Sequence, residues 1–393
     1  MDQAVDSSGR RRKRPRWLWP AIITLSVVVL VVASISTRAA ELQLDADSLA
    51  IGSLLLANGA AEISVKGPLA KDSAVQVTAD SYFHIGSNTK AMTATMIAAL
   101  VEEGLLDWDT TVSEVWPEQS ATFNEAMREA SLHELLTHRS GIQAFTAGSE
   151  WKAVPEREGG SRERRLSFAQ WLLAQEPAGR RGLYLYSNAG YCVASAMAEE
   201  RSGQSWEELM QQRLFDPLGM QVQLGWPLDH DAAEPTGYTI RGSKVFPYGR
   251  LQGYSMPPEI APAGDLSMPL GEYAKFLQLH IDGLSGSPSL LSADSFAFLH
   301  EPSGHYACGW IVLERDVETP QGPLHERIST HDGSAGTFYI HTVLSHTRHC
   351  AAAAVVNCGD DGARKLTTRM VDEQLATLNA DGTATAAQDA DSR

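Results

Sequence analysis

The sequence predicts an α+β fold, with one antiparallel sheet built from strands at both ends of the chain, flanked by helices, and a separate helical lobe. Apolar runs of strand length occur near both ends of the body. The middle of the chain instead carries apolar residues at helical spacing, between capping residues and glycines. We expect a functional site in the cleft between the sheet and the lobe, where two packed parts meet.

The composition is that of a globular protein with an acidic body. Of the 393 residues, 43% are hydrophobic and 20% are charged, which excludes global disorder and allows a large core. The formal net charge is −16. Residues 1–40, with seven basic and two acidic side chains, contribute +5, so the remainder carries −21. So acidic a body argues against a nucleic-acid partner.

The N-terminal segment has the pattern of a membrane anchor. Residues 1–16 form a basic tail, and residues 17–36 are uncharged over about 20 positions, enough to cross a bilayer. Basic residues before the span place the tail in the cytoplasm, so we expect a single-pass membrane protein with a periplasmic or otherwise extracytoplasmic domain. A cleaved signal peptide ending near Thr37-Arg38-Ala39 is the alternative, but the uncharged run is long for one, which favours a signal-anchor.

Residues 45–379 are expected to form one domain, and its strands lie near its two ends. Leu49 to Ala57 and Ala61 to Val65 flank Asn58-Gly59, a dipeptide typical of a tight hairpin turn. Three further strands are predicted at 306–313, 337–344 and 351–356. Residues 380–393 are mostly Ala, Asp and Thr without an apolar anchor, and we predict a disordered tail there.

Helical spacing predicts the lobe and the cover of the sheet. Helices are expected at 91–101, 132–137, 189–201 with Asn188 as N-cap, 205–214 ended by Asp216-Pro217, 270–279 and 361–378. Two segments lack a clear period. We expect the charged segment 156–165 to be a solvated loop, and 227–262 to be an excursion near the cleft.

A candidate nucleophile, Ser87, stands at the start of the first of these helices. Lys90 follows three residues later on the same helix face, so its amine can meet the Ser87 hydroxyl. A serine becomes a good nucleophile when a neighbour takes its proton, and a helix N-terminus favours the resulting negative charge. This is the S-x-x-K arrangement of serine acyl enzymes. A second copy, Ser149 to Lys152, opens no long helix, and we attribute it to chance.

Two further stretches can complete a site. Tyr186-Ser187-Asn188 precedes a helix, and residues two apart in an extended segment point the same way, so Tyr186 and Asn188 can both enter the cleft. A lysine beside a tyrosine favours the phenolate, which makes Tyr186 a candidate general base. His331-Asp332-Gly333-Ser334 opens the strand at 337–344, whose edge can offer a backbone N–H to an oxyanion.

Together these stretches resemble the serine β-lactamase-related family, in its branch of class C β-lactamases, D-alanyl-D-alanine peptidases and esterases. The resemblance covers about Ser48 to Leu378. The segments 83–106, 135–142 and 184–220 follow the family pattern, and Ala263 to Ser267 and Gly309-Trp310 also match. It implies the β-lactamase/penicillin-recognising fold and an enzyme that works through an acylated serine.

The resemblance also implies a role for each candidate residue. Ser87 is the acylated nucleophile, and Lys90 and Tyr186 transfer protons. The substrate-binding groups are Asn188 and the third motif, His331, Asp332, Gly333 and Ser334, and the backbone N–H groups of Ser87 and Ser334 form the oxyanion hole.

The third motif departs from the family, in which lactamases of this branch have Lys-Thr-Gly and peptidases often His-Thr-Gly. In the cleft, Asp332 would repel the carboxylate of a β-lactam or of a terminal D-alanine, by about 4 kcal/mol at about 4 Å in an effective dielectric near 20. The alternative is that Asp332 turns away from the cleft and pairs with a neighbour.

No metal or other cofactor is expected. His133 and His138 lie five residues apart, not four, and so leave a common helix face. Three histidines near a predicted strand turn lack a carboxylate at ligand spacing, and we expect them at the surface: His341, His346 and His349. Of the four cysteines, Cys308 and Cys350 can form a cross-strand disulfide outside the cytoplasm, or all four are buried thiols; both alternatives stay open.

We therefore expect a membrane-anchored, extracytoplasmic serine hydrolase that acts on small ester or amide substrates through a Ser87 acyl-enzyme. The alternatives are a penicillin-binding peptidoglycan D-alanyl-D-alanine peptidase, which would act on a cell-wall peptide, and a β-lactamase. A non-catalytic binding protein with the same fold is a further alternative, although a binder has no chemical need for Ser87, Lys90 and Tyr186 together. The sequence leaves the oligomeric state open.

Overall fold

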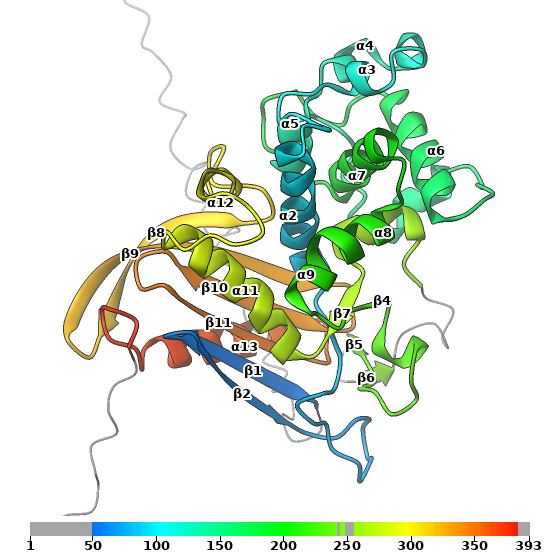
Figure 1. The fold of residues 1–393 in the computed structure, drawn as a ribbon. Coiled ribbons are helices and arrows are strands. Elements are labelled where there is room, and N and C mark those ends of the chain that lie inside the picture. Colours follow the sequence, from blue (N-terminus) through cyan, green and yellow to red (C-terminus); the bar gives the residue numbers. More distant parts are fainter. Residues whose placement is uncertain (1–48, 242–243, 248–254, 384–393) are drawn as a thin grey trace, which may run out of the picture. The chain divides into compact units, whose positions relative to one another are not determined.

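The main sheet combines strands from both ends of the chain, as predicted (Figure 1). The computed structural model describes residues 49–383 except 242–243 and 248–254. The six antiparallel strands lie in the order β2-β1-β11-β10-β9-β8. Their bounds are β1 Ile51–Ala57, β2 Ala60–Lys66, β8 Ile311–Thr319, β9 Gly322–Ser334, β10 Tyr339–Ser345 and β11 Cys350–Val356.

The predicted hairpin at Asn58-Gly59 is confirmed. Ala57 pairs with Ala60 across the turn, and both turn residues have positive φ, 53° and 72°, as a type I′ turn requires. β1 then pairs with β11, which brings the two ends of the chain into one sheet. β11 is buried along its whole length, which explains its unbroken run of alanine and valine.

The strand that carries His331 differs from the prediction. His331 to Ser334 do not open the following strand; they end β9, which pairs with β10 on one side and with β8 on the other. The strand expected at 306–313 starts only at Ile311 and continues to Thr319. Charged residues are frequent in β8 and β9, and the outer part of this hairpin is half-exposed or exposed, so the sequence shows no apolar alternation there.

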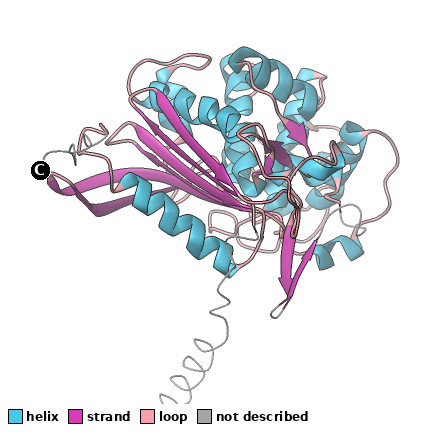
Figure 2. Ribbon diagram, turned by 90° about the horizontal axis from the view of Figure 1, so that it is seen from below, coloured by secondary structure: helices cyan, strands magenta, loops and turns pink. Residues whose placement is uncertain are grey.

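Helices cover both faces of the sheet (Figure 2). The helix α11 (Leu270–Leu284) shares a buried cluster with Ile340 and Leu344 of β10, whereas α13 (Asp361–Leu375) shares one with Val343. Successive side chains of a strand point to opposite faces, so the two helices use alternate residues of β10. The cluster under α11 also contains the helices of the lobe, so the lobe and α13 lie on opposite faces.

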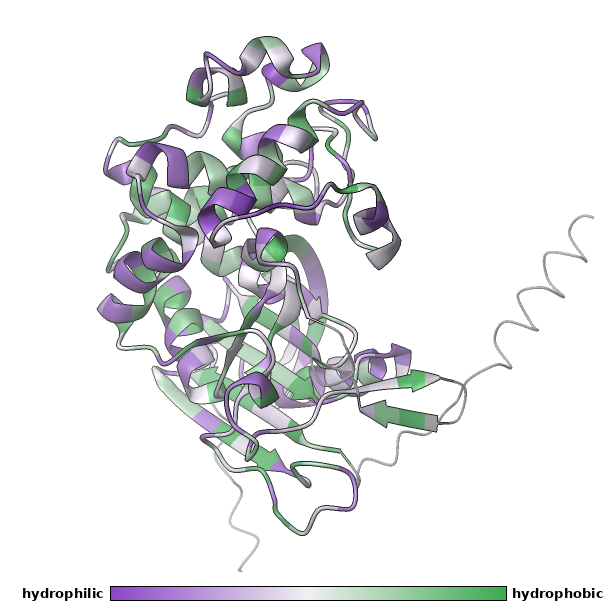
Figure 3. Cartoon of the chain, turned by 90° about the vertical axis from the view of Figure 1, so that its right-hand side faces the viewer, coloured by the Kyte–Doolittle hydropathy of each residue, from purple (hydrophilic) through white to green (hydrophobic). Residues whose placement is uncertain are grey.

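The helical lobe is arranged around α2 (Thr89–Glu102), which rises from the sheet in Figure 1. Every residue of α2 up to Leu100 is buried, and apart from Lys90 and three threonines these residues are apolar, as expected for a helix in the core. Hydrophilic segments lie mostly on the outer helices and loops in Figure 3. The remaining helices are α3 (Val112–Val115), α4 (Glu125–Arg128), α5 (Leu132–Leu136), α6 (Ser161–Leu173), α7 (Asn188–Ser202), α8 (Trp206–Met210), α9 (Asp216–Leu218), α10 (Ala261–Gly264) and α12 (Ala293–Leu299).

Two predictions for the lobe are wrong in part. The expected solvated loop at 156–165 contains the start of α6, and Arg165 is buried beside two carboxylates. The helix expected to stop before Asp216-Pro217 instead continues through a π-helical turn into α9. Pro217 does not stop the helix, which ends at Gly219, a residue with φ +58°.

Two small sheets complete the structure. β3 (Phe83–His84), β7 (Leu266–Met268) and β4 (Gln223–Leu224) form one of them, and β3 leads directly into Ser87. β5 (Tyr238–Arg241) and β6 (Lys244–Pro247) form a hairpin within the predicted excursion.

The expected disordered tail begins in ordered structure. The Asn379 N–H donates to the Thr383 carbonyl at 2.8 Å, and Leu378, the last residue of the predicted final helix, is fully buried and fixes the start of this segment. Residues 384–393, and the expected basic tail and anchor at 1–36, lie outside the described residues. Within the described part of the chain, no helix combines the length and the apolar character needed to cross a membrane.

Candidate active site

Ser87 lies in a single 3₁₀ turn, Gly86–Asn88, between β3 and α2. The strand before it is fixed by pairing of Phe83 with Met268, and the helix after it is buried. Between Phe83 and Leu100, Ser87 is the only residue that is not buried. The turn therefore presents one hydroxyl at the surface of an otherwise buried segment.

The amine of Lys90 is buried and has three oxygen partners. Its Nζ lies 3.1 Å from Ser87 Oγ, 2.7 Å from Asn188 Oδ1 and 2.7 Å from the Ala263 carbonyl oxygen. The amide and carbonyl oxygens can only accept, whereas the hydroxyl can also donate. A neutral amine can thus donate its two protons to Asn188 and Ala263 and turn its lone pair to Ser87. Burial lowers the pKa of Lys90 to about 7, which makes the neutral form accessible near neutral pH.

Tyr186 is the second partner of the nucleophile. Its hydroxyl donates to Ser87 Oγ at 3.0 Å, and Lys90 Nζ lies 4.9 Å from the centroid of its ring. Burial raises the pKa of Tyr186 above its ordinary value, because a buried phenolate loses its hydration. The raised pKa favours the protonated phenol, so Lys90 is the better placed proton acceptor, and a role for Tyr186 as a phenolate base stays a prediction.

Asn188 is placed for Lys90 and does not cap the helix. The N-cap of α7 is Ser187, whose Oγ accepts the Gly190 N–H at 2.9 Å. The Asn188 side chain instead accepts from Lys90 and donates to the Phe145 carbonyl at 2.9 Å. The backbone oxygens of Phe145 and Ala263 have no residue-specific signal, so the sequence could not identify them as parts of the site.

Two glycines let the end of β9 dock against the nucleophile turn. Gly86 has φ +50°, and a Cβ there would lie 2.4 Å from the backbone nitrogen of Ser334. A Cβ on Gly333 would lie 1.9 Å from the Ile85 carbonyl oxygen. This close approach brings the Ser334 backbone beside Ser87, as an oxyanion hole formed by their two N–H groups would require.

His331 lies on the same face of β9 as Gly333, the face toward the lobe. It is buried, and its ring centroid lies 6.4 Å from that of Tyr186. Its Nε2 is 3.0 Å from the Tyr306 hydroxyl, and its Nδ1 is 2.7 Å from the carbonyl oxygen of Asp332. Burial, followed by the nearby Lys90 charge, lowers the pKa of His331 to about 4, so the imidazole is neutral at pH 7.

Asp332 does not face the site. It pairs in register with His341 of β10, and its carboxylate accepts a hydrogen bond from His341 Nδ1 at 2.6 Å. His341 lies between Ile340 and Thr342, on the α13 face of the sheet, opposite Ser87. The expected repulsion of a substrate carboxylate is therefore wrong, and the alternative of pairing with a neighbour agrees with the structure. Because successive side chains of a strand point to opposite faces, Asp332 and His331 cannot both face the site.

An aromatic group that the sequence did not indicate packs behind the site. His138 lies 4.4 Å from both the Tyr186 and the Tyr306 rings, measured between centroids, and its Nδ1 accepts the Ser187 N–H at 3.1 Å. Tyr306 is fully buried against His331. Tyr306 comes from a segment without a motif, and His138, although it lies within 135–142, carried no sign of its role, so only the packing reveals them.

The similarity to known proteins agrees with this geometry. A family model described as Beta-lactamase matches residues 52–375. The chain belongs to the Beta-lactamase family. The family resemblance, the fold and the assignment as a serine hydrolase of this family are thereby confirmed.

The relatives within the Beta-lactamase family are distant. The chain is 26% identical to penicillin-binding protein 4 of Amycolatopsis lactamdurans, over 75% of this chain and 76% of that protein. It is 28% identical to an unguisins hydrolase of Aspergillus violaceofuscus, over 52% of this chain and only 37% of that protein. A solved class C β-lactamase has a TM-score of 0.66 at 19% identity and covers 93% of this chain and 99% of that chain, which shows the fold.

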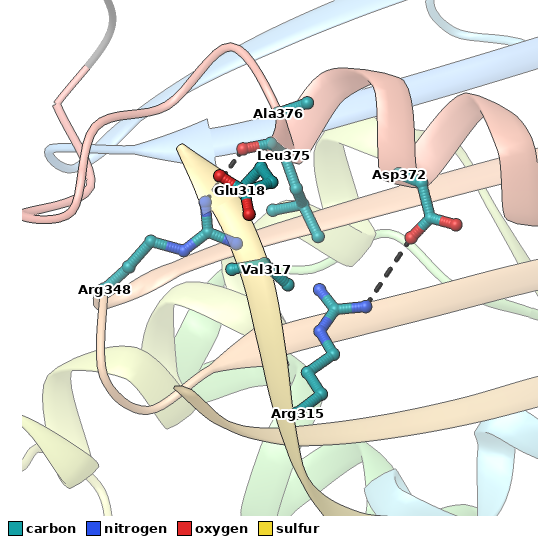
Figure 4. Close-up of a pocket in the computed structure, with 7 residues that line it drawn as sticks. All are labelled: Arg315, Val317, Glu318, Arg348, Asp372, Leu375 and Ala376. Atoms are coloured by element: carbon teal, nitrogen blue, oxygen red, sulfur yellow. Dashed lines mark hydrogen bonds and ion pairs between the residues drawn. The ribbon is translucent and has the colours of Figure 1, made fainter. Parts of the chain in front are cut away.

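Three other groups of side chains within the described residues show no arrangement of a second active site. A pocket of about 280 Å³ between β8 and α13 contains two arginines, and Figure 4 shows Arg315 paired with Asp372, at 3.5 Å. Arg348 pairs with the buried Glu326 at 2.8 Å. Among the described residues, no cluster of histidine, cysteine and carboxylate side chains could hold a metal ion. The four cysteines are free and buried, so the disulfide alternative is not realised.

Two sequence expectations outside the site have different outcomes. The second S-x-x-K copy lies in a 3₁₀ helix, Gly148–Ala153, with Ser149 and Lys152 exposed, in agreement with its interpretation as chance. The expectation that His346 is a surface residue is wrong in part, because its Nε2 is 2.7 Å from the Ser329 hydroxyl in a half-buried position.

Proposed function

We propose that the protein is a serine acyl hydrolase that acts on small ester or amide substrates through an acyl-enzyme on Ser87. The observation that carries this proposal is the pair of contacts to Ser87 Oγ, from Lys90 Nζ at 3.1 Å and from the Tyr186 hydroxyl at 3.0 Å. A nucleophile with a base in reach, itself oriented by a third group, is the arrangement that covalent catalysis needs. Asn188 is that third group, because it accepts from Lys90.

In the proposed reaction, neutral Lys90 accepts the Ser87 proton while Oγ attacks the substrate carbonyl carbon. The negative charge on the carbonyl oxygen is stabilised by the backbone N–H groups of Ser87 and Ser334. The C–O or C–N bond then breaks, and the leaving group takes the proton by way of Lys90 or the Tyr186 hydroxyl. Water attacks the acyl ester in the same manner and regenerates Ser87.

A second candidate function is a peptidase or β-lactamase activity on carboxylate-bearing substrates. The similarity to a penicillin-binding protein supports it. This activity would use the same Ser87 acyl-enzyme. It would also need protein groups that bind the carboxylate of the substrate. Both ring nitrogens of His331 already have partners within the protein, which favours uncharged esters and amides over substrates with a carboxylate.

Covalent labelling tests the proposed nucleophile. A fluorophosphonate should react with the full-length chain by forming a bond between a serine Oγ and phosphorus, with release of fluoride. Mass spectrometry is expected to locate the adduct on Ser87 and to find the exposed Ser149 unlabelled. Ser149→Ala is the matched control and should label normally. An adduct on Ser149, or undiminished labelling of Ser87→Ala, contradicts the proposal.

We also propose that residues 17–36 hold the enzyme in a membrane with its catalytic domain on the extracytoplasmic side. The uncharged span behind a basic block supports this, as does Arg38, which makes a poor cleavage site. After alkaline carbonate washing of membranes, the full-length chain is expected in the pellet. A soluble product that starts near Ala40 would show instead that the segment is a signal peptide.

A further inference from the structure

The hydrogen bonds of His331 determine which of its nitrogens carries the proton. Nδ1 lies 2.7 Å from the Asp332 carbonyl oxygen, which can only accept, so Nδ1 must be protonated. In a neutral imidazole the other nitrogen then has a lone pair. The Tyr306 hydroxyl, 3.0 Å from Nε2, also has a hydrogen bond with Tyr191, whose own proton goes to the Leu136 carbonyl oxygen. An imidazole lone pair is a stronger acceptor than a phenol oxygen, so Nε2 accepts the Tyr306 proton. Both ring nitrogens are occupied within the protein.

This arrangement leaves the site without the donor that a histidine could supply. A carboxylate bound in a partly buried cleft needs cationic or N–H partners, because its desolvation is otherwise uncompensated. The His331 ring lies 6.4 Å from that of Tyr186, measured between centroids, yet it offers the site neither a charge nor an N–H. Nε2 would become available to a substrate only if its hydrogen bond with the Tyr306 hydroxyl were broken.

We propose that Tyr306 is a positioning residue of the active site: its hydroxyl holds His331 as the neutral Nδ1–H tautomer and so excludes substrates with a carboxylate beside the scissile bond. The inference rests on the proposed function, which it deepens by naming uncharged esters and amides as the substrate class. Tyr306 itself is fully buried. It acts through His331 and does not touch the reacting atoms.

The tautomer can be measured directly in the unmodified protein. In the full-length chain labelled with ¹⁵N only at histidine, long-range ¹H–¹⁵N spectra distinguish protonated from unprotonated ring nitrogens. The chain has twelve histidines, and the signals that are lost in His331→Gln are those of His331. At pH 7 they should show a protonated Nδ1 and a bare Nε2. A charged ring, or a protonated Nε2, overturns the proposal whatever the variants do.

The consequence for substrates is tested with Tyr306→Phe. Loss of the donor to the neutral ring should raise the His331 pKa and free Nε2 to bind a carboxylate. The measurement is kcat/KM for a phenyl ester and for its 3-carboxyphenyl counterpart, which differ only in the charged group. Tyr306→Phe should raise the ratio of carboxylate to neutral ester roughly tenfold, since a hydrogen bond to a charged group is among the stronger ones. The gain should grow from pH 7 to pH 5, as the freed imidazole becomes protonated.

Tyr184→Phe is the matched control, because this tyrosine belongs to the same aromatic group but is more exposed. It should leave the ratio unchanged. The proposal is wrong if Tyr306→Phe changes kcat/KM for both esters by the same factor, or if it leaves the His331 spectrum as in the wild type. Tyr306 would then have a packing role alone. The eleven other histidine signals report whether the variant is folded. Failure of both esters to acylate Ser87 would instead refute the proposed function, and the substrate exclusion with it, while the tautomer is still decided by the spectrum.

Discussion

Replacing Lys90 by alanine is expected to lower kcat/KM for a neutral ester by about 10²–10⁴-fold, the range for loss of a positioned acid–base group. Two described groups lie within hydrogen-bonding distance of Ser87 Oγ, Lys90 and Tyr186. Of these two, Lys90 is the one whose surroundings favour a neutral form that can accept a proton. The same pKa gives the pH dependence. A protonated amine has no lone pair, so activity should be lost as the pH falls through about 7 and should be constant above it.

The three residues at the nucleophile should act as one unit. Groups that act as a unit lose activity non-additively, so Lys90→Ala, Tyr186→Phe and the double variant should all reach similar low rates, close to that of Ser87→Ala. Lys90→Arg separates a base from a positive charge, because arginine stays protonated. It should be as inactive as Lys90→Ala. Lys152→Ala, in the chance copy of the motif, is the control and should be unchanged.

Two results would contradict this unit. If the loss in the double variant equals the product of the single losses, Lys90 and Tyr186 act independently. If Lys90→Arg retains activity, the lysine supplies charge and not a proton acceptor, and a Tyr186 phenolate base would become the better explanation.

Replacing Arg165 by methionine is expected to destabilise the fold by about 3–5 kcal/mol, measured as the free energy of unfolding in urea. The guanidinium is fully buried, bonds Glu199 at 2.9 Å and Glu207 at 2.8 Å, and donates to the Pro258 carbonyl at 2.6 Å. Its removal leaves the Glu199 carboxylate, whose side chain is 2% exposed, without its cation. A buried charge that loses its partner is far more costly than a surface one.

Two further variants test that reason. Arg165→Met combined with Glu199→Gln removes the unpaired charge but keeps an oxygen acceptor for the backbone N–H of Trp206. The double variant should therefore be more stable than the single Arg165→Met. Arg213→Met breaks the exposed pair with Glu103 and should cost no more than about 1 kcal/mol. Equal losses in Arg165→Met and Arg213→Met would show that burial of the pair does not set its contribution.

Local chemistry in the sequence identified the nucleophile and its helix. The run from Ala91 to Val101 is apolar apart from two threonines, so Ser87 and Lys90 just before it stand out as a hydroxyl and an amine at the start of a buried helix. The hairpin at Asn58-Gly59 and the sheet from both ends followed from turn chemistry and from apolar runs. These features depend on residues close in the chain, and a single sequence contains that information.

The predicted fold already joined the two chain ends in one sheet, but the individual partners and the strand register across distant segments were decided only in the tertiary structure. Arg165 has the appearance of a solvated residue in a charged run until α7 and α8 bring Glu199 and Glu207 to it. His331 to Ser334 belong to β9, whose charged outer half hides the strand, and the register with β10 then sends Asp332 to the α13 face. Protonation followed the same rule, because burial among distant segments makes Lys90 a base, keeps Tyr186 protonated, and leaves His331 neutral against Tyr306. Desolvation and long-range hydrogen bonds are properties of the folded chain, and no local pattern of residues encodes them.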